Sequence, residues 1–221
     1  MKQLPRATIH LTSIVSNWQA LDGLHPGATT AAVVKADAYG LGAVPVSRAL
    51  LRAGCSTFFV AYLEEALAVR KALGLGPRIF VLNGPARAEM SAYIAAGITA
   101  VLSSPDHLKA WASAPKGTCA LHFDTGMNRL GLKTTTLATT LAALQRLHPV
   151  LVMSHLACAD ETGNPMNSAQ RKAFDDITSA FADTPASLSN SAGCYLGKAF
   201  GYDLTRPGIA LYGGSRPPKG V

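Results

Sequence analysis

Long hydrophobic runs, clustered charges and an N-terminal leader are all missing from this sequence. No uninterrupted apolar stretch approaches the roughly 18 residues that a membrane span needs. Residues 1–10 lack the continuous apolar segment and the cleavage site of a secretory signal, so we expect a cytoplasmic protein with no membrane partner. Charged residues make up only 15%, which argues against long disordered tails, whereas hydrophobic residues make up 48%, enough for one sizeable core in 221 residues.

Cysteine pairs and basic runs are also missing. The four cysteines are far apart and form no Cys-x-x-Cys pair, so we expect no metal site and buried free thiols at Cys55, Cys119, Cys158 and Cys194. The net charge is +7, but Lys and Arg occur singly and without interleaved aromatic residues, so we expect no nucleic-acid partner. A basic pocket for small anions, or an acidic partner domain, accounts for the charge equally well.

What the chain does contain is a regular alternation of short apolar segments and amphipathic ones. The short segments predict strands buried on both faces, at residues 30–34, 57–61, 78–82, 98–102, 118–123, 150–154, 185–189 and 203–205. The others predict helices, at residues 63–73, 87–96, 106–112, 135–147 and 166–182. This pattern favours an α/β fold, a (β/α)₈ TIM-type barrel formed as one domain by residues 1–221, with its last helix shortened or absent. A doubly wound open sheet is the alternative.

Residues with chemical potential follow the ends of these predicted strands, where a barrel forms its active site. Lys35 ends the apolar run 31–34, and a turn with Tyr39 and Gly40 follows it. A lysine presented from an apolar wall suits Schiff-base chemistry, because desolvation lowers its pKa and frees the lone pair of the amine. Taken alone, the same lysine would sooner place its ammonium in water, because most lysines are solvated.

Two consecutive loops at the end of the chain predict a phosphate site. Gly208 allows close approach of the backbone to a ligand, and the preceding loop holds Asn190, Ser191 and a second glycine. Arg206 lies just before the Gly208 turn. If its side chain lay beside a cofactor ring, it could not accept a proton from that ring. The alternative is an arginine paired with Asp203 or Asp124.

Two further candidates end apolar strands. Arg129, in the glycine-flanked loop 124–131, could bind a substrate carboxylate through its planar guanidinium, or could be an ordinary surface residue. His155 follows the strand at 150–154, and it could pack on a cofactor, orient Arg206, or be purely structural.

These segments together resemble the N-terminal domain of the pyridoxal phosphate (PLP)-dependent alanine racemases. The matching segments are residues 33–42, 124–131, 154–160, 190–193 and 206–213, which occur in the family's order along nearly the whole chain. The first and last are highly specific. The resemblance implies racemisation of alanine, which supplies D-alanine for peptidoglycan, with PLP carrying the carbanion chemistry.

The resemblance also implies residue roles. Lys35 would hold PLP covalently and act as the base on one face of the substrate, and Arg129 would contact the substrate carboxylate. Arg206 would hydrogen-bond the pyridine nitrogen, and His155 would lie beside the ring. The phosphate would be held by Tyr39, Ser191, Gly208 and Ile209.

The sequence departs from the family at three places. His122 stands where members often carry a carbamylated lysine that positions Arg129, so another group or an anion would have to support that arginine. Ser187 stands where a histidine is common near Arg206. Members also continue into a C-terminal β domain, which carries the tyrosine that acts as second base and reaches the partner subunit in a homodimer.

The absence of that domain from this sequence leads us to expect that the chain binds PLP but racemises alanine poorly or not at all by itself. Two alternatives remain. One is a stand-alone non-catalytic barrel like the PLP homeostasis proteins, and the other is a phosphate-binding barrel without PLP.

Overall fold

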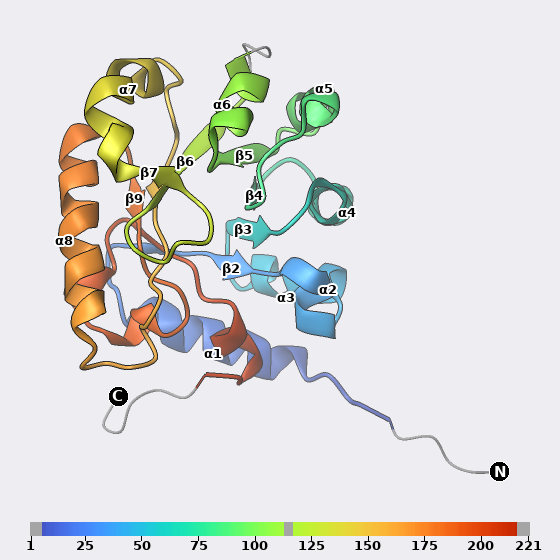
Figure 1. Ribbon diagram of the computed structural model, residues 1–221. Coiled ribbons are helices and arrows are strands. Elements are labelled where there is room, and N and C mark those ends of the chain that lie inside the picture. Colours follow the sequence, from blue (N-terminus) through green and yellow to red (C-terminus); the bar gives the residue numbers. More distant parts are fainter. Residues whose placement is uncertain (1–5, 113–116, 216–221) are drawn as a thin grey trace.

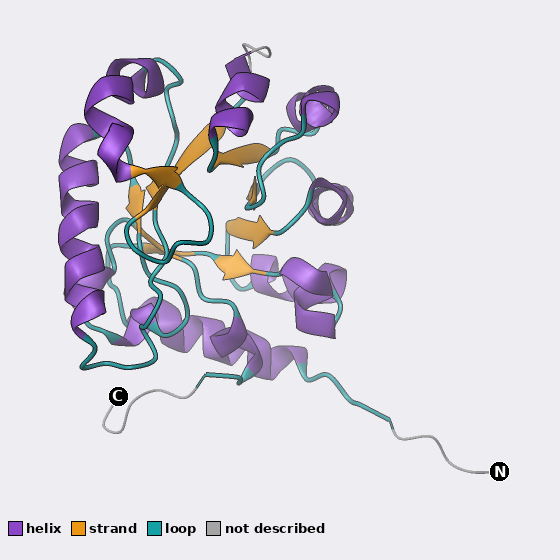
Figure 2. Cartoon of the chain, in the orientation of Figure 1, coloured by secondary structure: helices purple, strands orange, loops and turns teal. Residues whose placement is uncertain are grey.

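Parallel strands form a ring with helices on its outside in the computed structural model, which describes residues 6–112 and 117–215 (Figures 1 and 2). Seven strands lie side by side in the order β2, β3, β4, β5, β6, β8, β9, and β1 pairs with β10. Their bounds are β1 Thr29–Thr30, β2 Ala32–Val33, β3 Thr57–Val60, β4 Arg78–Val81, β5 Thr99–Leu102, β6 Cys119–Asp124, β8 Val152–Met153, β9 Ala186–Ser187 and β10 Leu204–Thr205. The short strand β7 (Leu132–Lys133) pairs with β6 outside this order.

Backbone hydrogen bonds close the ring on both sides of β10. The Asp203 and Arg206 amides donate to the Ala186 and Ser189 carbonyls, at 3.1 and 2.9 Å. On the other side the Ala31 amide donates to the Thr205 carbonyl at 2.9 Å. The predicted barrel is therefore confirmed, and the alternative of an open doubly wound sheet is excluded because both of its edges are paired.

Alternate residues of the strands face two different cores. Phe59 and Phe80 point into the barrel and stack with ring centroids 4.6 Å apart, together with seven other buried apolar residues. Phe58 and Ile79, their chain neighbours, belong instead to the larger core between strands and helices. Strands buried on both faces read as continuous apolar runs, which is why the sequence located them.

The helices cover the outside of the ring. Their bounds are α1 Leu11–Gly23, α3 Ala43–Arg52, α4 Leu63–Leu73, α5 Met90–Ala95, α6 Pro105–Ala112, α7 Leu137–Gln145 and α8 Pro165–Ala180. Five of them match predicted segments, whereas α1 and α3 were not predicted. None of the helices in the described residues is long and apolar enough to cross a membrane.

The final βα unit is completed by α1, which comes from the other end of the chain. After β10 the described chain forms only the 3₁₀ turn η5 (Ile209–Tyr212), in agreement with a shortened last helix. Helix α1 packs beside this turn, and the Asn17 side-chain amide donates to the Leu211 carbonyl at 2.9 Å. The Trp18 indole donates to the Thr30 carbonyl at 3.0 Å, which ties the helix to β1.

The cysteines form no disulfide among the described residues. Cys55, Cys119 and Cys194 are buried free thiols as predicted, and burial raises the pKa of each to about 12. Cys158 is also free but only partly buried, so the expectation of burial was wrong for this residue. It ends up in the loop after β8, where its thiol contacts the Met166 sulfur at 3.7 Å.

Candidate functional site

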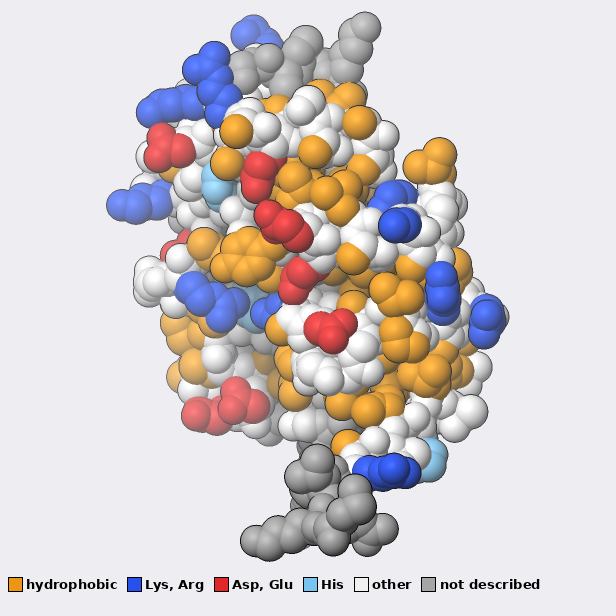
Figure 3. Space-filling model, turned by 90° about the vertical axis from the view of Figure 1, so that its right-hand side faces the viewer, with side chains coloured by type: hydrophobic (Ala, Val, Ile, Leu, Met, Phe, Trp, Pro, Cys, Tyr) orange, Lys and Arg blue, Asp and Glu red, His pale blue; other side chains and the backbone are white. Residues whose placement is uncertain are grey.

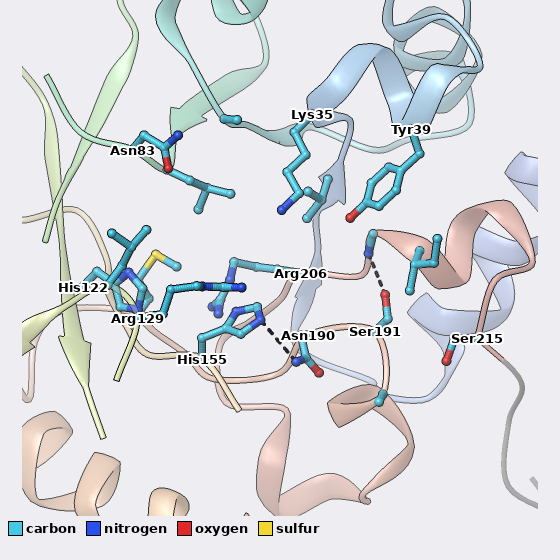
Figure 4. Close-up of a pocket in the computed structure, with 18 of the residues that line it drawn as sticks. Lys35, Tyr39, Asn83, His122, Arg129, His155, Asn190, Ser191, Arg206 and Ser215 are labelled. Carbon is cyan, nitrogen blue, oxygen red and sulfur yellow. Dashed lines mark hydrogen bonds between the residues drawn. The ribbon is translucent and has the colours of Figure 1, made fainter. Parts of the chain in front are cut away.

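A cavity of about 640 Å³ opens at the carboxyl ends of the barrel strands, within the range of small-molecule sites. Its lining includes every residue that the sequence analysis singled out for a site: Lys35, Tyr39, Arg129, His155, Ser191, Arg206, Gly208 and Ile209. The strand-end reasoning therefore located the cavity correctly. Figure 4 shows six of these side chains converging from segments far apart in the sequence: Lys35, Tyr39, Arg129, His155, Ser191 and Arg206.

Lys35 projects its amine into the cavity from the segment directly after β2 (Figure 4). Burial lowers the pKa of Lys35, and the positive charge of Arg129 lowers it further, whereas Glu65 raises it. The balance is a lowered pKa, which increases the fraction of neutral, nucleophilic amine near neutral pH. Desolvation of this lysine was the basis of its selection from the sequence.

The turn after Lys35 has an unusual conformation. Four successive residues, Ala36 to Tyr39, have φ between 51° and 56°, so the segment α2 (Lys35–Gly40) is left-handed. For residues other than glycine, this backbone conformation costs roughly 1–2 kcal/mol of conformational energy per residue. The Ala38 amide donates to the Val34 carbonyl at 2.9 Å, and the Asp37 carboxylate accepts from the Ala43 amide at 2.6 Å. These bonds hold the turn, which places Tyr39 beside Lys35 at the edge of the cavity (Figure 4).

Tyr39, Ser191 and the Gly208 turn form a cradle with hydrogen-bond donors. The Ser191 hydroxyl accepts from the amides of Gly208 and Ala210, at 2.8 and 3.2 Å. A Cβ placed on Gly208 would lie 2.4 Å from the Tyr39 hydroxyl, so only glycine lets this hydroxyl approach the turn. With both amides donating to Ser191, the serine and tyrosine hydroxyls are the donors left to face the cavity, and they are suited to an anion such as phosphate.

Arg206 lies on the floor of the cavity and is buried. Its guanidinium donates to the Ser187 hydroxyl and to the carbonyls of Ser154 and Leu188. The alternative pairing with Asp203 or Asp124 is therefore wrong, since the Asp203 carboxylate accepts from the Ala186 amide and that of Asp124 from its own loop. Burial lowers the pKa of Arg206 to about 9, which still leaves it protonated at neutral pH. It can donate hydrogen bonds into the cavity but cannot accept a proton there.

Two histidines beside the arginines, the buried His122 and the partly buried His155, are neutral at neutral pH. Burial lowers the pKa of His122 to about 3, with further lowering by Arg206 and Arg129. The pKa of His155 is lowered well below its ordinary value by the same causes, burial first. The Asn190 side-chain amide lies 3.3 Å from His155 Nε2, which can accept its hydrogen bond. The hydrogen-bond partners of the Arg206 guanidinium are Ser187, Ser154 and Leu188, so the suggestion that His155 orients Arg206 is not supported by a hydrogen bond among the described residues. The Nδ1 atom of His122 has no hydrogen-bond partner within residues 6–112 and 117–215.

The positive charges in the cavity are not paired with acids. Lys35, Arg129 and Arg206 all line it, and the one ion pair within 4 Å among the described residues joins Lys109 and Asp106 elsewhere. Arg129 lies on an exposed loop but its guanidinium extends over the cavity beside His155 (Figure 4). A cavity with three unpaired cations is suited to ligands that carry more than one negative group.

Sequence reasoning did not assign several residues that shape this site. The Tyr212 hydroxyl donates to the Val33 carbonyl at 3.0 Å, and its ring lies 5.0 Å from that of Tyr39, so it supports the tyrosine of the cradle. Tyr62 and Asn83 also line the cavity, after β3 and β4. Their signal was available, since both directly follow predicted strands.

A comparison with protein families matches residues 9–216 to the alanine racemase N-terminal domain. The chain is 46% identical over 217 residues to an alanine racemase of Rhodospirillum rubrum, covering 94% of this chain and 58% of that protein. It is also 46% identical over 215 residues to a catabolic alanine racemase of Mesorhizobium japonicum, covering 93% and 56%. The chain thus spans somewhat more than half the length of these relatives.

Solved structures agree with this match. A crystal structure of alanine racemase from Bartonella henselae with covalently bound pyridoxal phosphate superposes with a TM-score of 0.90 at 34% identity, covering 97% of this chain and 67% of that one. The biosynthetic alanine racemase from Pseudomonas aeruginosa gives a TM-score of 0.86 at 34% identity, covering 96% and 60%.

Proposed function

This chain belongs to the family of alanine racemase N-terminal domains, and we propose that it is the PLP-binding barrel of an enzyme that interconverts L- and D-alanine. The observation that carries the proposal is the meeting of a partly desolvated amine, Lys35, with the anion cradle at Ser191 and Gly208 in one cavity. In a cell the product would be D-alanine for peptidoglycan, and the enzyme would work in the cytoplasm.

The residues present fit PLP. The cofactor carries an aldehyde, a phosphate and a pyridine nitrogen, and the cavity offers an amine, a cradle of hydroxyl donors at the Gly208 turn, and a buried guanidinium. Lys35 would hold the aldehyde carbon, Tyr39, Ser191, Gly208 and Ile209 the phosphate, and Arg206 the ring nitrogen. When bound, PLP supplies an electron sink that stabilises the carbanion of the substrate.

The chain's own residues then bind the substrate and move one proton. Arg129, exposed at the mouth of the cavity, would hold the substrate carboxylate, because a planar guanidinium binds carboxylates through two donors. The lowered pKa of Lys35 would allow its Nζ atom to take the α-proton from one face of the substrate. Arg206 stays protonated, so it would leave the ring nitrogen without an added proton and weaken the electron sink, which suppresses side reactions such as transamination.

Racemisation needs a second acid–base group on the opposite face of the substrate. We expect this group from a C-terminal domain, which would also bring the homodimer of the full-length family. The chain alone should therefore bind PLP and turn over alanine poorly or not at all. A stand-alone PLP-binding barrel that performs no turnover is the second candidate.

Cofactor binding is tested by mixing the chain with PLP, reducing it with borohydride and mapping the adduct by peptide mass. The adduct is expected on Lys35 and should be lost in Lys35→Ala but kept in Lys71→Ala, a matched control on the exposed end of α4. Pyridoxal, which lacks the phosphate, should bind more weakly than PLP. Equal binding of the two would contradict the assignment of the cradle.

Catalysis is tested by coupling D-alanine formation to a D-amino acid oxidase. We expect turnover only when the chain is joined to a C-terminal domain such as that of the Rhodospirillum rubrum relative. Full turnover by the chain alone would refute the need for a second domain. PLP binding without turnover in the joined protein would favour the non-catalytic barrel.

A further inference from the structure

Glu65 differs from the other acidic side chains on its side of the molecule. Figure 3 shows the side on which α2, α4 and α5 lie, where acidic side chains form a row beside hydrophobic patches. Glu65 is only partly exposed, and its carboxylate accepts hydrogen bonds from three backbone amides. Three amide donors fix a carboxylate far more firmly than water does.

Capping of helix α4 explains the hydrogen bonds of only one of the two carboxylate oxygens of Glu65. Oε2 accepts from the amides of Ala61 and Tyr62, at 2.7 and 3.2 Å, as a glutamate in the first turn of a helix commonly does. Oε1 accepts from the Ala36 amide at 2.6 Å, 29 residues away in the sequence. Ala36 directly follows Lys35 and begins the left-handed turn.

This second contact acts on the strained part of the site. The turn from Ala36 to Tyr39 is held in a backbone region that non-glycine residues avoid, and such strain persists only where surrounding contacts enforce it. The bond from Ala36 to Glu65 fixes the first residue of the turn to the start of α4. It therefore determines where the chain leaves β2 and how Lys35 and Tyr39 face the cavity.

We propose that Glu65 is a positioning residue for Lys35, whose carboxylate joins the left-handed turn to the end of β3 and the start of α4 and so presents the lysine to the cavity. This proposal rests on the proposed function only in what the positioned lysine is for. The contacts of Glu65 themselves are present in the chain without a cofactor.

The charge of Glu65 has a second consequence for the same lysine. The groups that face Lys35 are Arg129 after β6, His155 after β8, Tyr39 on its own turn and Glu65 on α4. Burial and Arg129 lower the pKa of Lys35, and His155 is neutral. Glu65 is the group that opposes this lowering. Its removal should therefore shift the titration of the amine to lower pH.

Hydrogen exchange tests the geometric part on the chain without cofactor. In Glu65→Gln one carboxylate oxygen becomes an NH₂ group, which cannot accept from the amides it faces. We expect exchange of the Ala36 amide to rise about tenfold or more in Glu65→Gln and in Glu65→Ala, because a charge-assisted hydrogen bond is lost. Amides of β6 and β8 should keep their rates.

Glu89→Gln is the matched control. Glu89 also accepts a hydrogen bond at a helix start, from the Ala86 amide at 2.8 Å, in the next βα unit along the chain. Its variant should leave the Ala36 amide unchanged. If Glu65→Ala does not fold, Glu65→Gln, which keeps the shape and one acceptor, carries the test. The remaining carbonyl oxygen gains two hydrogen bonds when it faces Ala61 and Tyr62 and only one when it faces Ala36, so we expect the NH₂ group opposite the Ala36 amide. Unchanged exchange of that amide in Glu65→Gln would overturn the proposal.

Trace acetylation across a pH series tests the effect on the amine, with Lys71 as internal reference. The labelling midpoint of Lys35 should fall in Glu65→Gln and stay in place in Glu89→Gln, a result that mere loss of a helix cap would not give. An unchanged or higher labelling midpoint of Lys35 in Glu65→Gln would overturn the proposed role of Glu65. Since both measurements use the chain without PLP, failure of PLP binding would count against the proposed function and leave this test intact.

Discussion

A methyl group added at Gly208 tests whether the cradle is as tight as the structure indicates. In Gly208→Ala the new Cβ would lie 2.4 Å from the Tyr39 hydroxyl and 3.2 Å from the Val33 Cβ. The Tyr39 hydroxyl oxygen is the atom nearest to the new Cβ, so we expect a steric cost at this contact. Overpacking of this kind costs about 1–3 kcal/mol, which lowers the Tm by roughly 2–4 °C per kcal/mol in a chain of this size.

The tyrosine hydroxyl is the specific obstacle, so its removal should relieve the cost. In Tyr39→Phe the nearest ring atom would lie 3.3 Å from the new Cβ, which small adjustments accommodate. A double-mutant cycle measured by urea denaturation of the cofactor-free chain should therefore give a coupling energy of about 0.5–2 kcal/mol in favour of the double variant. PLP binding should weaken in each single variant, since each disturbs the cradle.

Gly76→Ala is the control for a general effect of added methyl groups. Gly76 lies in the loop between α4 and β4 with no atom within 4 Å of an added Cβ, so its variant should keep both stability and PLP binding. Equal destabilisation by Gly208→Ala in the wild-type and Tyr39→Phe backgrounds would refute the reasoning, because the hydroxyl would then not be the group that is displaced.

Three further outcomes follow from buried polar groups. Ser191→Ala should cost about 1–3 kcal/mol in urea denaturation, because it leaves the amides of Gly208 and Ala210 without their acceptor, and PLP should then restore part of the loss. Arg206→Lys should cost about 2–4 kcal/mol, since one ammonium cannot reproduce the fork of donors, and an unchanged midpoint would contradict the buried network. The pKa of His122 is lowered to about 3, so between about pH 6.5 and 3 the unfolded state binds a proton that the folded state does not. The free energy of unfolding should therefore fall by about 1.4 kcal/mol for each pH unit by which the pH is lowered through this window. Replacement of His122 by Phe should reduce that slope by one proton in the pH dependence of the free energy of unfolding.

The strands and the larger helices could be predicted because their cause is local. A strand buried on both faces leaves an apolar run, and the match at β3, β4 and α4 is within one residue at each end. Helix α1 was missed although Ile14, Trp18 and Leu21 recur at helical spacing, because no capping residue or acidic first turn marks its start. Helix α3 was missed because Pro45 stands near its beginning.

The sequence could predict where the candidate site lies, but not the backbone conformation and the hydrogen bonds inside it. Strand-end positions place Lys35, Ser191 and Gly208 at one face of a barrel, whatever the details of the loops. The left-handed turn could not be predicted, since alanine and aspartate rarely adopt it and only contacts such as that from Glu65 impose it. The partners of Arg206 were also hidden, because two of the three are backbone carbonyls that any sequence would supply.

The positive charges of the cavity have to be held in place by the fold before a ligand binds. Lys35, Arg129 and Arg206 repel one another, and among the described residues none forms an ion pair within 4 Å. Arg206 is held by its carbonyl partners and Lys35 by the turn that Glu65 secures, so the cost of assembling like charges is met by the fold. An anionic ligand then gains from charges already in place and needs little reorganisation. For the same reason ligand binding should raise the stability of the chain, by RT ln(1 + [L]/Kd), and most strongly at low ionic strength.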